Sequence, residues 1–321
     1  MAPDLISPDV RVVIVTFNSA DVIAKCLASL ESDVECGLAE VVVVDNVSTD
    51  ATCEIVDSFH WVHLIRSQSN NGFGAGNNQG AAGASADYLF FLNPDSIVKE
   101  DVIRSLMGLM DSNSSIACCG PAIQNERGEI ELSSFRFTTP LTSVWIALGL
   151  QRLAPLNRIN GRLGIGSRPP STTCDVDRVL GAAMMMRRKL FEDEGGFDEN
   201  FFLYSEEEDL CLRLNLHGGK TVYHPHAVVF HIGAHSTGEG SSLAMASSVW
   251  SRQFFLKKHY GRIPAAASRV VWIFSLACKY LLSLLLSTFK SRRRAYRDAL
   301  YSLLSDNYYQ RRIRPISQRS D

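Results

Sequence analysis

Apolar residues in the first hundred positions occur in short, nearly continuous runs that amphipathic stretches separate. Four of these runs are rich in β-branched and aromatic residues, which predicts buried strands: 11–17 (RVVIVTF), 40–44 (EVVVV), 61–67 (WVHLIRS) and 87–93 (DYLFFLN). Residues 22–30 repeat apolar side chains at helical spacing, and Ser48–Asp50 offers capping side chains for another helix. Strands alternating with helices predict right-handed βαβ units and a mostly parallel, helix-covered sheet.

Polar residues follow each of the four predicted strands. They are Thr16, Phe17 and Asn18 after the first strand, Asp45 and Asn46 after the second, Asn71, Gly72, Phe73 and Gly74 after the third, and Asn93 and Asp95 after the fourth. Ligands of parallel sheets bind outside the carboxyl ends of the strands, so the set predicts one binding crevice. Turn formation alone explains any single member of the set equally well.

The stretch 70–83 (NNGFGAGNNQGAAG) has the most biased composition of the chain. Repeated glycine lets backbone N–H groups approach a phosphate or a sugar, and we expect the Ala-rich end of the stretch to start a helix whose N-terminus favours an anion. The spacing differs from the dinucleotide-binding GxGxxG motif, and the stretch follows the third strand instead of the first. Further on, 116–123 (IACCGPAI) and 129–135 (EIELSSF) predict antiparallel additions to the sheet.

Four consecutive acidic residues, Glu206, Glu207, Glu208 and Asp209, precede an amphipathic stretch that predicts a helix. The helix dipole favours carboxylates at that N-terminus. With 3.6 residues per turn, Glu206 and Asp209 share a face with Arg213, and Glu207 points about 100° away. A catalytic carboxylate and a purely structural acidic turn with an Asp209–Arg213 ion pair both explain this run.

Three histidines, His224, His226 and His231, lie around a short predicted strand. We interpret His224 and His226 as structural residues. His231, close to carboxylates and a phosphate site, fits a centre for Mn²⁺ or Mg²⁺, because both ions prefer oxygen ligands and Mn²⁺ accepts imidazole more readily.

The chain has 321 residues, of which 46% are hydrophobic and 21% charged, so disordered and fibrous classes are excluded. The net charge of −2 conceals an asymmetry: residues 257–321 carry 14 Lys/Arg and 3 Asp/Glu, a net charge of +11. We therefore predict a catalytic domain over 1–256 and a basic, apolar helical region over 257–321 that meets an anionic surface. The eight cysteines form no CxxC pair, which fits a reducing compartment, and the N-terminus shows no secretory signal.

The basic region contains an apolar 20-mer at 270–289 that Lys279 interrupts and that basic residues follow up to 294. The central lysine disfavours a simple membrane span. An in-plane helix on anionic lipid, over 270–294, and a core helix that packs on the catalytic domain or on a second subunit are both consistent with the pattern.

Seven motifs in the right order resemble the family 2 glycosyltransferases, and within them the rhamnosyltransferase-like branch. They span roughly residues 10–260 and read VTFNS (15–19), VVVDNVSTD (42–50), NNGFGAGNNQG (70–80), FLNPD (91–95), GAAMMMRR (181–188), GGFDENFFLYSEEEDLCLR (195–213) and HIGAHS (231–236). The resemblance implies a GT-A fold, in which helices flank a Rossmann-like, mostly parallel sheet. A C-terminal helical, membrane-associating appendage would complete this α/β architecture.

The same resemblance implies inverting transfer of a sugar from a nucleotide diphosphate donor. Asp45, with Thr16 and Asn18, is expected to hold the base and ribose. The rest of the expected nucleotide-sugar site comprises Phe17, Asn46, Asn71, Gly72, Phe73, Gly76, Asn77, Asn93 and Asp95.

The resemblance also implies roles in metal binding and proton transfer. Asn93-Pro94-Asp95 stands where the family has its Asp-x-Asp motif, so Asp95 is the expected ligand of Mn²⁺ or Mg²⁺, and His231 matches a histidine that reaches this metal. Glu207 occupies the second place of the family's Glu-Asp pair and is the expected base, with Glu206 and Asp209 as alternatives.

The expected reaction moves rhamnose from dTDP-rhamnose to a hydroxyl of a lipid-linked glycan in cell-surface polysaccharide synthesis. UDP-galactofuranose, UDP-GlcNAc and GDP-mannose are alternative donors. The expected location is cytoplasmic, peripheral on the inner face of the cell membrane, and a homo-oligomer is compatible with the sequence.

Two other classes of protein compete with this interpretation. A non-catalytic, membrane-docked nucleotide-sugar-binding protein is favoured only by the asparagine at position 93. A nucleic-acid binder would use the basic tail, but the apolar 20-mer dominates that tail and no groove-reading motif accompanies it, so no nucleic-acid partner is expected. Within the enzymes, the neighbouring alternative is a sugar nucleotidyltransferase, which would carry its Gly-rich loop after the first strand, where this chain has FNSAD.

Overall fold

The four apolar runs of the first hundred residues form neighbouring parallel strands of one sheet, as predicted. These strands are β1 (Val10–Thr16), β2 (Ala39–Asp45), β3 (Val62–Arg66) and β4 (Tyr88–Leu92). Val10 pairs with Ala39 of β2 on one side and with Tyr88 of β4 on the other. β1 is therefore an interior strand, and its continuous run of β-branched residues suits burial on both faces.

Beyond β4 the sheet continues with mixed strand directions, which confirms the predicted antiparallel additions. Among the residues that the structure describes, the sheet has ten strands, and its main path is β3-β2-β1-β4-β11-β6-β12-β5. Its further members are β5 (Ser96–Val98), β6 (Ile116–Gln124), β7 (Ile130–Glu131), β9 (Cys174–Val176), β11 (Ala183–Arg187) and β12 (Lys220–His231), while β8 (Ser134–Phe135) and β10 (Arg178–Val179) pair separately. β11 runs antiparallel to both β4 and β6, so it reverses the direction at the middle of the sheet.

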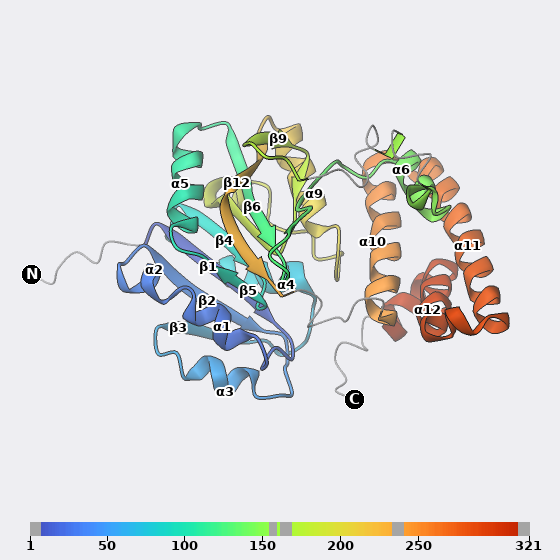
Figure 1. The fold of residues 1–321 in the computed structure, drawn as a ribbon, viewed down its shortest axis with the longest axis horizontal. Coiled ribbons are helices and arrows are strands. Elements are labelled where there is room, and N and C mark those ends of the chain that lie inside the picture. Colours follow the sequence, from blue (N-terminus) through green and yellow to red (C-terminus); the bar gives the residue numbers. More distant parts are fainter. Residues whose placement is uncertain (1–7, 154–158, 161–168, 233–240, 314–321) are drawn as a thin grey trace, which may run out of the picture. The chain divides into compact units, whose positions relative to one another are not determined.

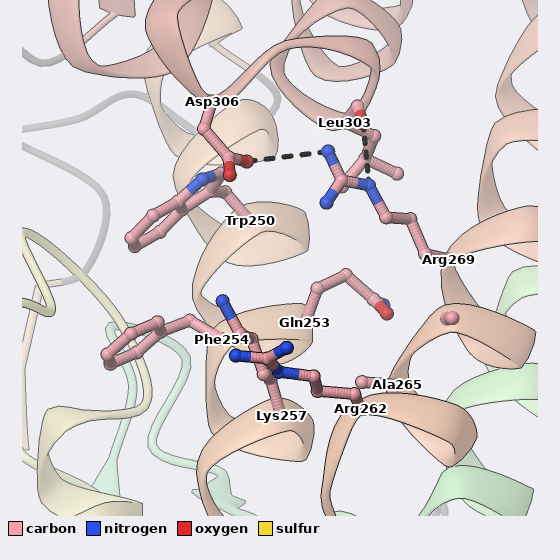
Figure 2. A pocket seen from close by; sticks show the side chains of 10 residues that line it. Trp250, Gln253, Phe254, Lys257, Arg262, Ala265, Arg269, Leu303 and Asp306 are labelled. Atoms are coloured by element: carbon pink, nitrogen blue, oxygen red, sulfur yellow. Dashed lines mark hydrogen bonds and ion pairs between the residues drawn. The ribbon is translucent and has the colours of Figure 1, made fainter.

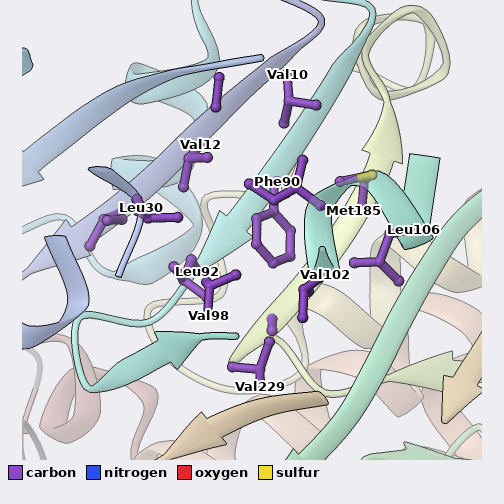
Figure 3. Packing of buried hydrophobic residues seen from close by; sticks show 14 of the residues in the cluster. Val10, Val12, Leu30, Phe90, Leu92, Val98, Val102, Leu106, Met185 and Val229 are labelled. Carbon is purple, nitrogen blue, oxygen red and sulfur yellow. The ribbon is translucent and has the colours of Figure 1, made fainter. Parts of the chain in front are cut away.

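Side-chain alternation along β1 and β2 assigns each residue to one of two apolar layers. Val10, Val12 and Ile14 pack in a cluster with residues of α1 (Ile23–Ala28) and α5 (Val102–Ser112). Figure 3 shows this layer between β1, β4 and the neighbouring elements. On the other face, Val15, Val42 and Val44 meet Phe73.

The Gly-rich stretch 70–83 is mostly helical, which corrects the prediction that only its Ala-rich end would start a helix. Helix α4 (Phe73–Ala81) begins directly after Gly72, whose φ is +98°. A Cβ atom at Gly76 would lie 2.8 Å from Val15 Cγ1, and one at Gly80 would lie 2.4 Å from Val13 Cγ1. The two glycines lie one turn apart, and they allow α4 to pack closely against β1.

The remaining helices of this part of the chain are α2 (Glu31–Glu35), α3 (Thr52–Asp57), α8 (Arg188–Asp193) and α9 (Glu206–Leu216) (Figure 1). Of these, α2 and α3 connect successive parallel strands, and α8 and α9 lie between β11 and β12 along the chain. The structure is a computed structural model that describes residues 8–153, 159–160, 169–232 and 241–313, apart from the side chains of 287–289, 312 and 313.

The chain forms two compact units: residues 1–135, 168–198 and 207–236, and residues 136–167, 199–206 and 237–321. The predicted boundary after residue 256 falls inside α10 (Ser242–Tyr260). This difference has a packing reason, because Ala246, Val249 and Trp250 of α10 share one apolar core with the C-terminal helices.

The second unit is helical. Besides α10 it contains α6 (Pro140–Ala147), η1 (Leu150–Arg152), α11 (Arg262–Leu285), η3 (Ser287–Arg292), α12 (Arg293–Leu304), α13 (Asp306–Tyr308) and η4 (Tyr309–Ile313). Polar contacts fix α11 against α6: Ser143 Oγ lies 2.8 Å from Ser268 Oγ, and Trp272 Nε1 donates to Ser143 Oγ at 3.0 Å. α11 is thus held by specific hydrogen bonds as well as by apolar packing.

One face of α11 carries exposed apolar side chains. Ile263, Val270, Phe274, Leu281 and Leu285 are 84%, 65%, 67%, 58% and 81% exposed. At about 100° per residue these five positions fall within an arc of roughly 60°. We call them the exposed apolar stripe of α11.

Within the part of the chain that the structure describes, α11 alone has the length and apolar composition to cross a bilayer. The contacts of Lys279 argue against a membrane span, because its Nζ lies 3.5 Å from the Ala147 carbonyl oxygen and faces the Trp272 ring. Burial lowers the pKa of Lys279, and Arg152 adds to this effect. One face of α11 therefore belongs to the core of the helical unit, and the stripe remains exposed.

Candidate active site

The carboxyl ends of β1 and β2 are tied together by side chains that the sequence analysis assigned to nucleotide binding. Thr16 Oγ1 donates to Asp45 Oδ1 at 3.1 Å, and the Ser48 amide donates to Asp45 Oδ2 at 2.9 Å. Asn18 has a left-handed backbone with φ of +50°, and its Oδ1 accepts from the Thr49 amide at 2.8 Å. Asp45 is thus buried and has a structural role in shaping this end of the sheet.

The start of α4 is fixed to the same strand ends. Asn46 Nδ2 donates to the Gly72 carbonyl oxygen at 3.2 Å, and the Asn46 amide donates to Thr16 O at 2.8 Å. Asn77 Nδ2 donates to the Phe73 carbonyl oxygen, while its buried Oδ1 has no hydrogen-bond partner within the described residues.

Four further members of the predicted nucleotide-sugar site differ in their placement. Phe17 and Phe73 are half-buried, and Asn71 is exposed. Gly76 faces Val15 of the sheet, so it serves helix packing instead of opening toward a ligand.

The end of β4 brings Asn93, Asp95 and His231 together, as the sequence predicted. His231 Nε2 lies 3.1 Å from Asp95 Oδ1 and 3.4 Å from Asn93 Nδ2. His231 is the last residue of β12, and its pairing with Ser96 of β5 places it there. The motif 231–236 continues beyond Ile232 into residues outside the described ranges.

The chemistry of this cluster fits a divalent cation. Asp95 Oδ1 is buried and makes no hydrogen bond within the described ranges, although His231 Nε2 is near. One carboxylate and one imidazole suit Mn²⁺, and also Mg²⁺ when phosphates and water supply the other ligands. Among the described residues, no group of three or more His, Cys, Asp or Glu side chains could hold a metal, and Asp95 and His231 are the two such side chains of this cluster.

Glu207 lies in the first turn of α9 and forms an ion pair with Arg178. The Arg178 Nη1 to Glu207 Oε1 distance is 2.9 Å, and both side chains are largely buried. Burial raises the pKa of Glu207, Arg178 opposes this shift, and Glu208 adds to it. A carboxylate with a raised pKa is a stronger base than an ordinary one, which suits proton abstraction near neutral pH.

Residues 181 and 182 connect Glu207 with the Asn93 cluster. A Cβ atom at Gly181 would lie 3.7 Å from Glu207 Cβ and 3.7 Å from the Phe73 ring. The next residue, Ala182, accepts a hydrogen bond from the Asn93 amide at 2.9 Å. The proposed base and the cation cluster therefore flank the same two-residue segment.

The other two candidate bases have different surroundings. Asp209 is fully buried, and its Oδ2 accepts from Arg213 Nε at 2.9 Å. Arg213 also donates to the carbonyl oxygens of Glu194 and Gly196, both at 2.7 Å. Asp209 therefore holds the i,i+4 ion pair that the sequence offered as its structural alternative. Glu206 is buried as well.

The backbone that leads into α9 is strained. Tyr204 and Ser205 have φ values of +70° and +68°, although neither is glycine. A left-handed conformation costs a non-glycine residue about 1–2 kcal/mol. Such strain concentrates at functional sites, where the surrounding structure holds it in place.

Arg178 is the site residue that sequence analysis missed. It also lies over the Phe135 ring, at 4.5 Å from the centroid. A lone arginine in a two-residue strand carries no recognisable pattern, so nothing in the sequence marked it. His224, interpreted as structural, indeed contacts Ser105 Oγ at 3.0 Å and Thr173 Oγ1 at 2.8 Å.

This sheet, with a buried carboxylate beside an Asp–His pair at its carboxyl edge, is that of a GT-A glycosyltransferase. A family model described as glycosyl transferase family 2 matches residues 11–195. The chain therefore belongs to glycosyl transferase family 2, as the resemblance implied.

Curated relatives point to the rhamnosyltransferase-like branch. The chain is 30% identical over 300 residues to an N-acetylglucosaminyl-diphospho-decaprenol L-rhamnosyltransferase of Mycobacterium tuberculosis, a match that covers 88% of this chain and 95% of the relative. It is 29% identical to the rhamnosyltransferase WbbL of Escherichia coli, over 70% of this chain and 84% of that protein.

Solved structures confirm the fold. The mannosyltransferase PcManGT from Pyrobaculum calidifontis, in complex with GDP-Man and Mn²⁺, has a TM-score of 0.56 at 16% identity, covering 95% of this chain and 90% of that one. GalNAc-T7 with UDP, GalNAc and Mn²⁺ has a TM-score of 0.58 at 16% identity, covering 97% of this chain and 57% of that one.

Proposed function

We propose that this glycosyltransferase transfers rhamnose, with inversion, from dTDP-rhamnose to a hydroxyl of a lipid-linked glycan. The observation that carries the proposal is the arrangement around Gly181 and Ala182, which joins Glu207 to the Asn93, Asp95 and His231 cluster. The names of the relatives support rhamnose as the donor sugar and a lipid diphosphate as the carrier of the acceptor.

Glu207 acts as the general base in this proposal. Its carboxylate takes the proton from the acceptor hydroxyl while that oxygen attacks the anomeric carbon and the bond to the nucleoside diphosphate breaks. A positioned base contributes roughly 10²- to 10⁴-fold to the rate. One attack from the face opposite the leaving group inverts the configuration, and no covalent nucleophile is needed.

Asp95 and His231 would hold Mn²⁺ or Mg²⁺, with Asn93 beside them. When bound, such an ion would neutralise negative charge on the leaving diphosphate. Arg178 keeps the Glu207 side chain in place and lowers its pKa toward the ordinary value, so that the carboxylate stays ionised.

Membrane docking is part of the proposal. The exposed apolar stripe of α11 would enter the interfacial region of the cytoplasmic leaflet, and the exposed Lys290 and Arg292 that follow it would meet anionic headgroups. A peripheral location on the inner face of the cell membrane brings the enzyme to a lipid-linked acceptor.

The test measures nucleoside diphosphate release by the full-length protein with a panel of nucleotide sugars, a membrane-lipid extract, and Mn²⁺ or Mg²⁺. We expect release from dTDP-rhamnose that requires both the extract and the metal. Glu207→Gln should lower release roughly 10²- to 10⁴-fold and spare donor binding by calorimetry, while the exposed control Glu54→Gln should behave as wild type. Release from a different donor would refute rhamnose as the transferred sugar, and full activity of Glu207→Gln would refute Glu207 as the general base.

A further inference from the structure

The helical unit contains a pocket that the proposed glycosyl transfer does not use. It has a volume of about 220 Å³ and lies between α10, α11, the end of α12 and the start of α13. Its lining is Trp250, Gln253, Phe254, Lys257, Arg262, Ala265, Ala266, Arg269, Leu303 and Asp306. Figure 2 shows Lys257 and Arg262 toward one end of the pocket, and Arg269 with Asp306 toward the other.

The charges of the pocket favour an anion. Arg269 is engaged, because it donates to the Leu303 carbonyl oxygen at 2.7 Å and pairs with Asp306 at 3.4 Å. Lys257 and Arg262 are exposed and have no ion-pair partner among the described residues. Three cations against one carboxylate leave the lining with two uncompensated positive charges. A phosphomonoester carries about the matching charge at neutral pH, and a guanidinium binds its oxygens in a planar fork.

The buried wall of the pocket adds a polar group that needs a ligand. Gln253 is 7% exposed, and its Nε2 donates to Ser268 Oγ at 3.3 Å. Its Oε1 is buried without a hydrogen-bond partner in the described part of the chain. Buried polar atoms are normally satisfied, so this acceptor predicts a donor on the ligand, such as a protonated phosphate oxygen or a hydroxyl.

The position of the pocket on α11 points to a ligand with an apolar part. Arg262, Ala265, Ala266 and Arg269 lie roughly 120° around the helix from the exposed apolar stripe. The stacked rings of Trp250 and Phe254, 5.4 Å apart, form an aromatic part of the lining. An acyl or prenyl chain on a headgroup in the pocket would contact these rings and pass about a third of a turn around α11 to reach the stripe.

We propose that this pocket binds the terminal phosphate of a membrane lipid, with Lys257 and Arg262 as the phosphate ligands and Gln253 as a hydrogen-bond acceptor. The inference deepens the membrane docking proposed above and rests on it. It gives that docking a chemical selectivity that a basic surface alone does not have, because diffuse charge attraction depends on surface charge and not on headgroup structure.

The test is cosedimentation of the full-length protein with phosphatidylcholine vesicles that contain phosphatidic acid, a phosphomonoester, or phosphatidylglycerol, a phosphodiester, at equal surface charge. We expect the wild type to bind phosphatidic acid vesicles roughly tenfold more tightly. The variant Lys257→Gln/Arg262→Gln should lose this preference. The control Lys290→Gln/Arg292→Gln removes the same charge outside the pocket and should weaken binding to both vesicles equally.

The proposal would be overturned if the pocket variant and the control variant lost the preference for phosphatidic acid vesicles equally. It would also be overturned if the wild type showed no such preference. Calorimetry with a soluble short-chain phosphatidic acid and with inorganic phosphate separates the sources of the phosphate. Heat from inorganic phosphate that Lys257→Gln/Arg262→Gln abolishes, without any heat from the lipid, would assign the pocket to a free anion and refute a lipid ligand. Binding of the short-chain lipid without vesicle binding would refute membrane docking alone. Neither assay contains donor or acceptor, so failure of glycosyl transfer leaves its result unchanged.

Discussion

Replacing Asp209 with asparagine should separate a structural carboxylate from a catalytic one in the first turn of α9. Glu206, Glu207 and Asp209 are all buried, so burial does not identify the base. The ion-pair partners distinguish Asp209 from Glu207. Asp209 pairs with Arg213, which also donates to two carbonyl oxygens, whereas Glu207 pairs with Arg178.

The expected loss of unfolding free energy depends on which partners Arg213 retains. Asparagine preserves the shape of Asp209 but removes its charge, and the Asp209 side chain is 0% exposed while that of Arg213 is 17% exposed. Breaking a buried ion pair by removing one partner costs about 3–5 kcal/mol. The second carboxylate near Arg213, Glu194 Oε2 at 3.5 Å, still offsets part of its charge. We therefore expect the lower end, about 3 kcal/mol of unfolding free energy.

The assay is urea unfolding followed by fluorescence, combined with nucleoside diphosphate release per folded molecule at a temperature where both variants are folded. Asp209→Asn should lower the unfolding midpoint and retain transfer. Glu207→Gln should keep stability within about 1 kcal/mol, because burial and Glu208 already disfavour the charge of Glu207, and Glu208 stays 3.8 Å from Arg178 Nε as a counter-charge. It should lose roughly 10²- to 10⁴-fold in transfer. The reverse pattern, a stable but inactive Asp209→Asn, would show that the reasoning from ion-pair partners is mistaken.

Three further predictions concern residues of the unit that contains the sheet. Arg178→Gln removes the cation that lowers the raised pKa of Glu207. Transfer needs the ionised carboxylate, so on acidification the variant should lose transfer at a higher pH than the wild type does. An unchanged pH–rate profile would contradict this prediction. Asp95→Asn should weaken donor binding with Mn²⁺ and leave metal-free binding unchanged, as calorimetry can check. Gly80→Ala should be about 2 kcal/mol less stable to urea than Gly108→Ala. The new Cβ at position 80 would clash with Val13, whereas a Cβ at position 108 would have no atom within 4 Å. Equal stabilities of the two variants would count against close packing of α4 on the sheet.

Much of the fold could be predicted because its signals are local. Each of the first four strands is a run of β-branched or aromatic residues, and the strands end where polar residues begin. Helix α4 was mispredicted because its glycines were interpreted through their backbone freedom. Their function at positions 76 and 80 depends on Val15 and Val13 of another element, which a local pattern does not contain.

The candidate site shows the same division. Asp95 and His231 come together as the motifs implied, although 136 positions separate them. Arg178 escaped notice because its importance arises only from its 2.9 Å contact with Glu207. The division of the chain into units was also beyond local patterns, since α6 joins the C-terminal helices through contacts such as Ser143 with Ser268.

The left-handed backbone of Tyr204 and Ser205 is a cost in stability that the chain carries beside its acidic turn. Glycine would adopt the backbone of Tyr204 and Ser205 without steric penalty, so a protein selected for stability alone would gain by placing it there. The chain instead carries a partly exposed aromatic ring and a hydroxyl next to its acidic turn. Substitutions at these two positions should therefore be among the easiest ways to stabilise the enzyme, and among the first whose effect on acceptor choice should be measured.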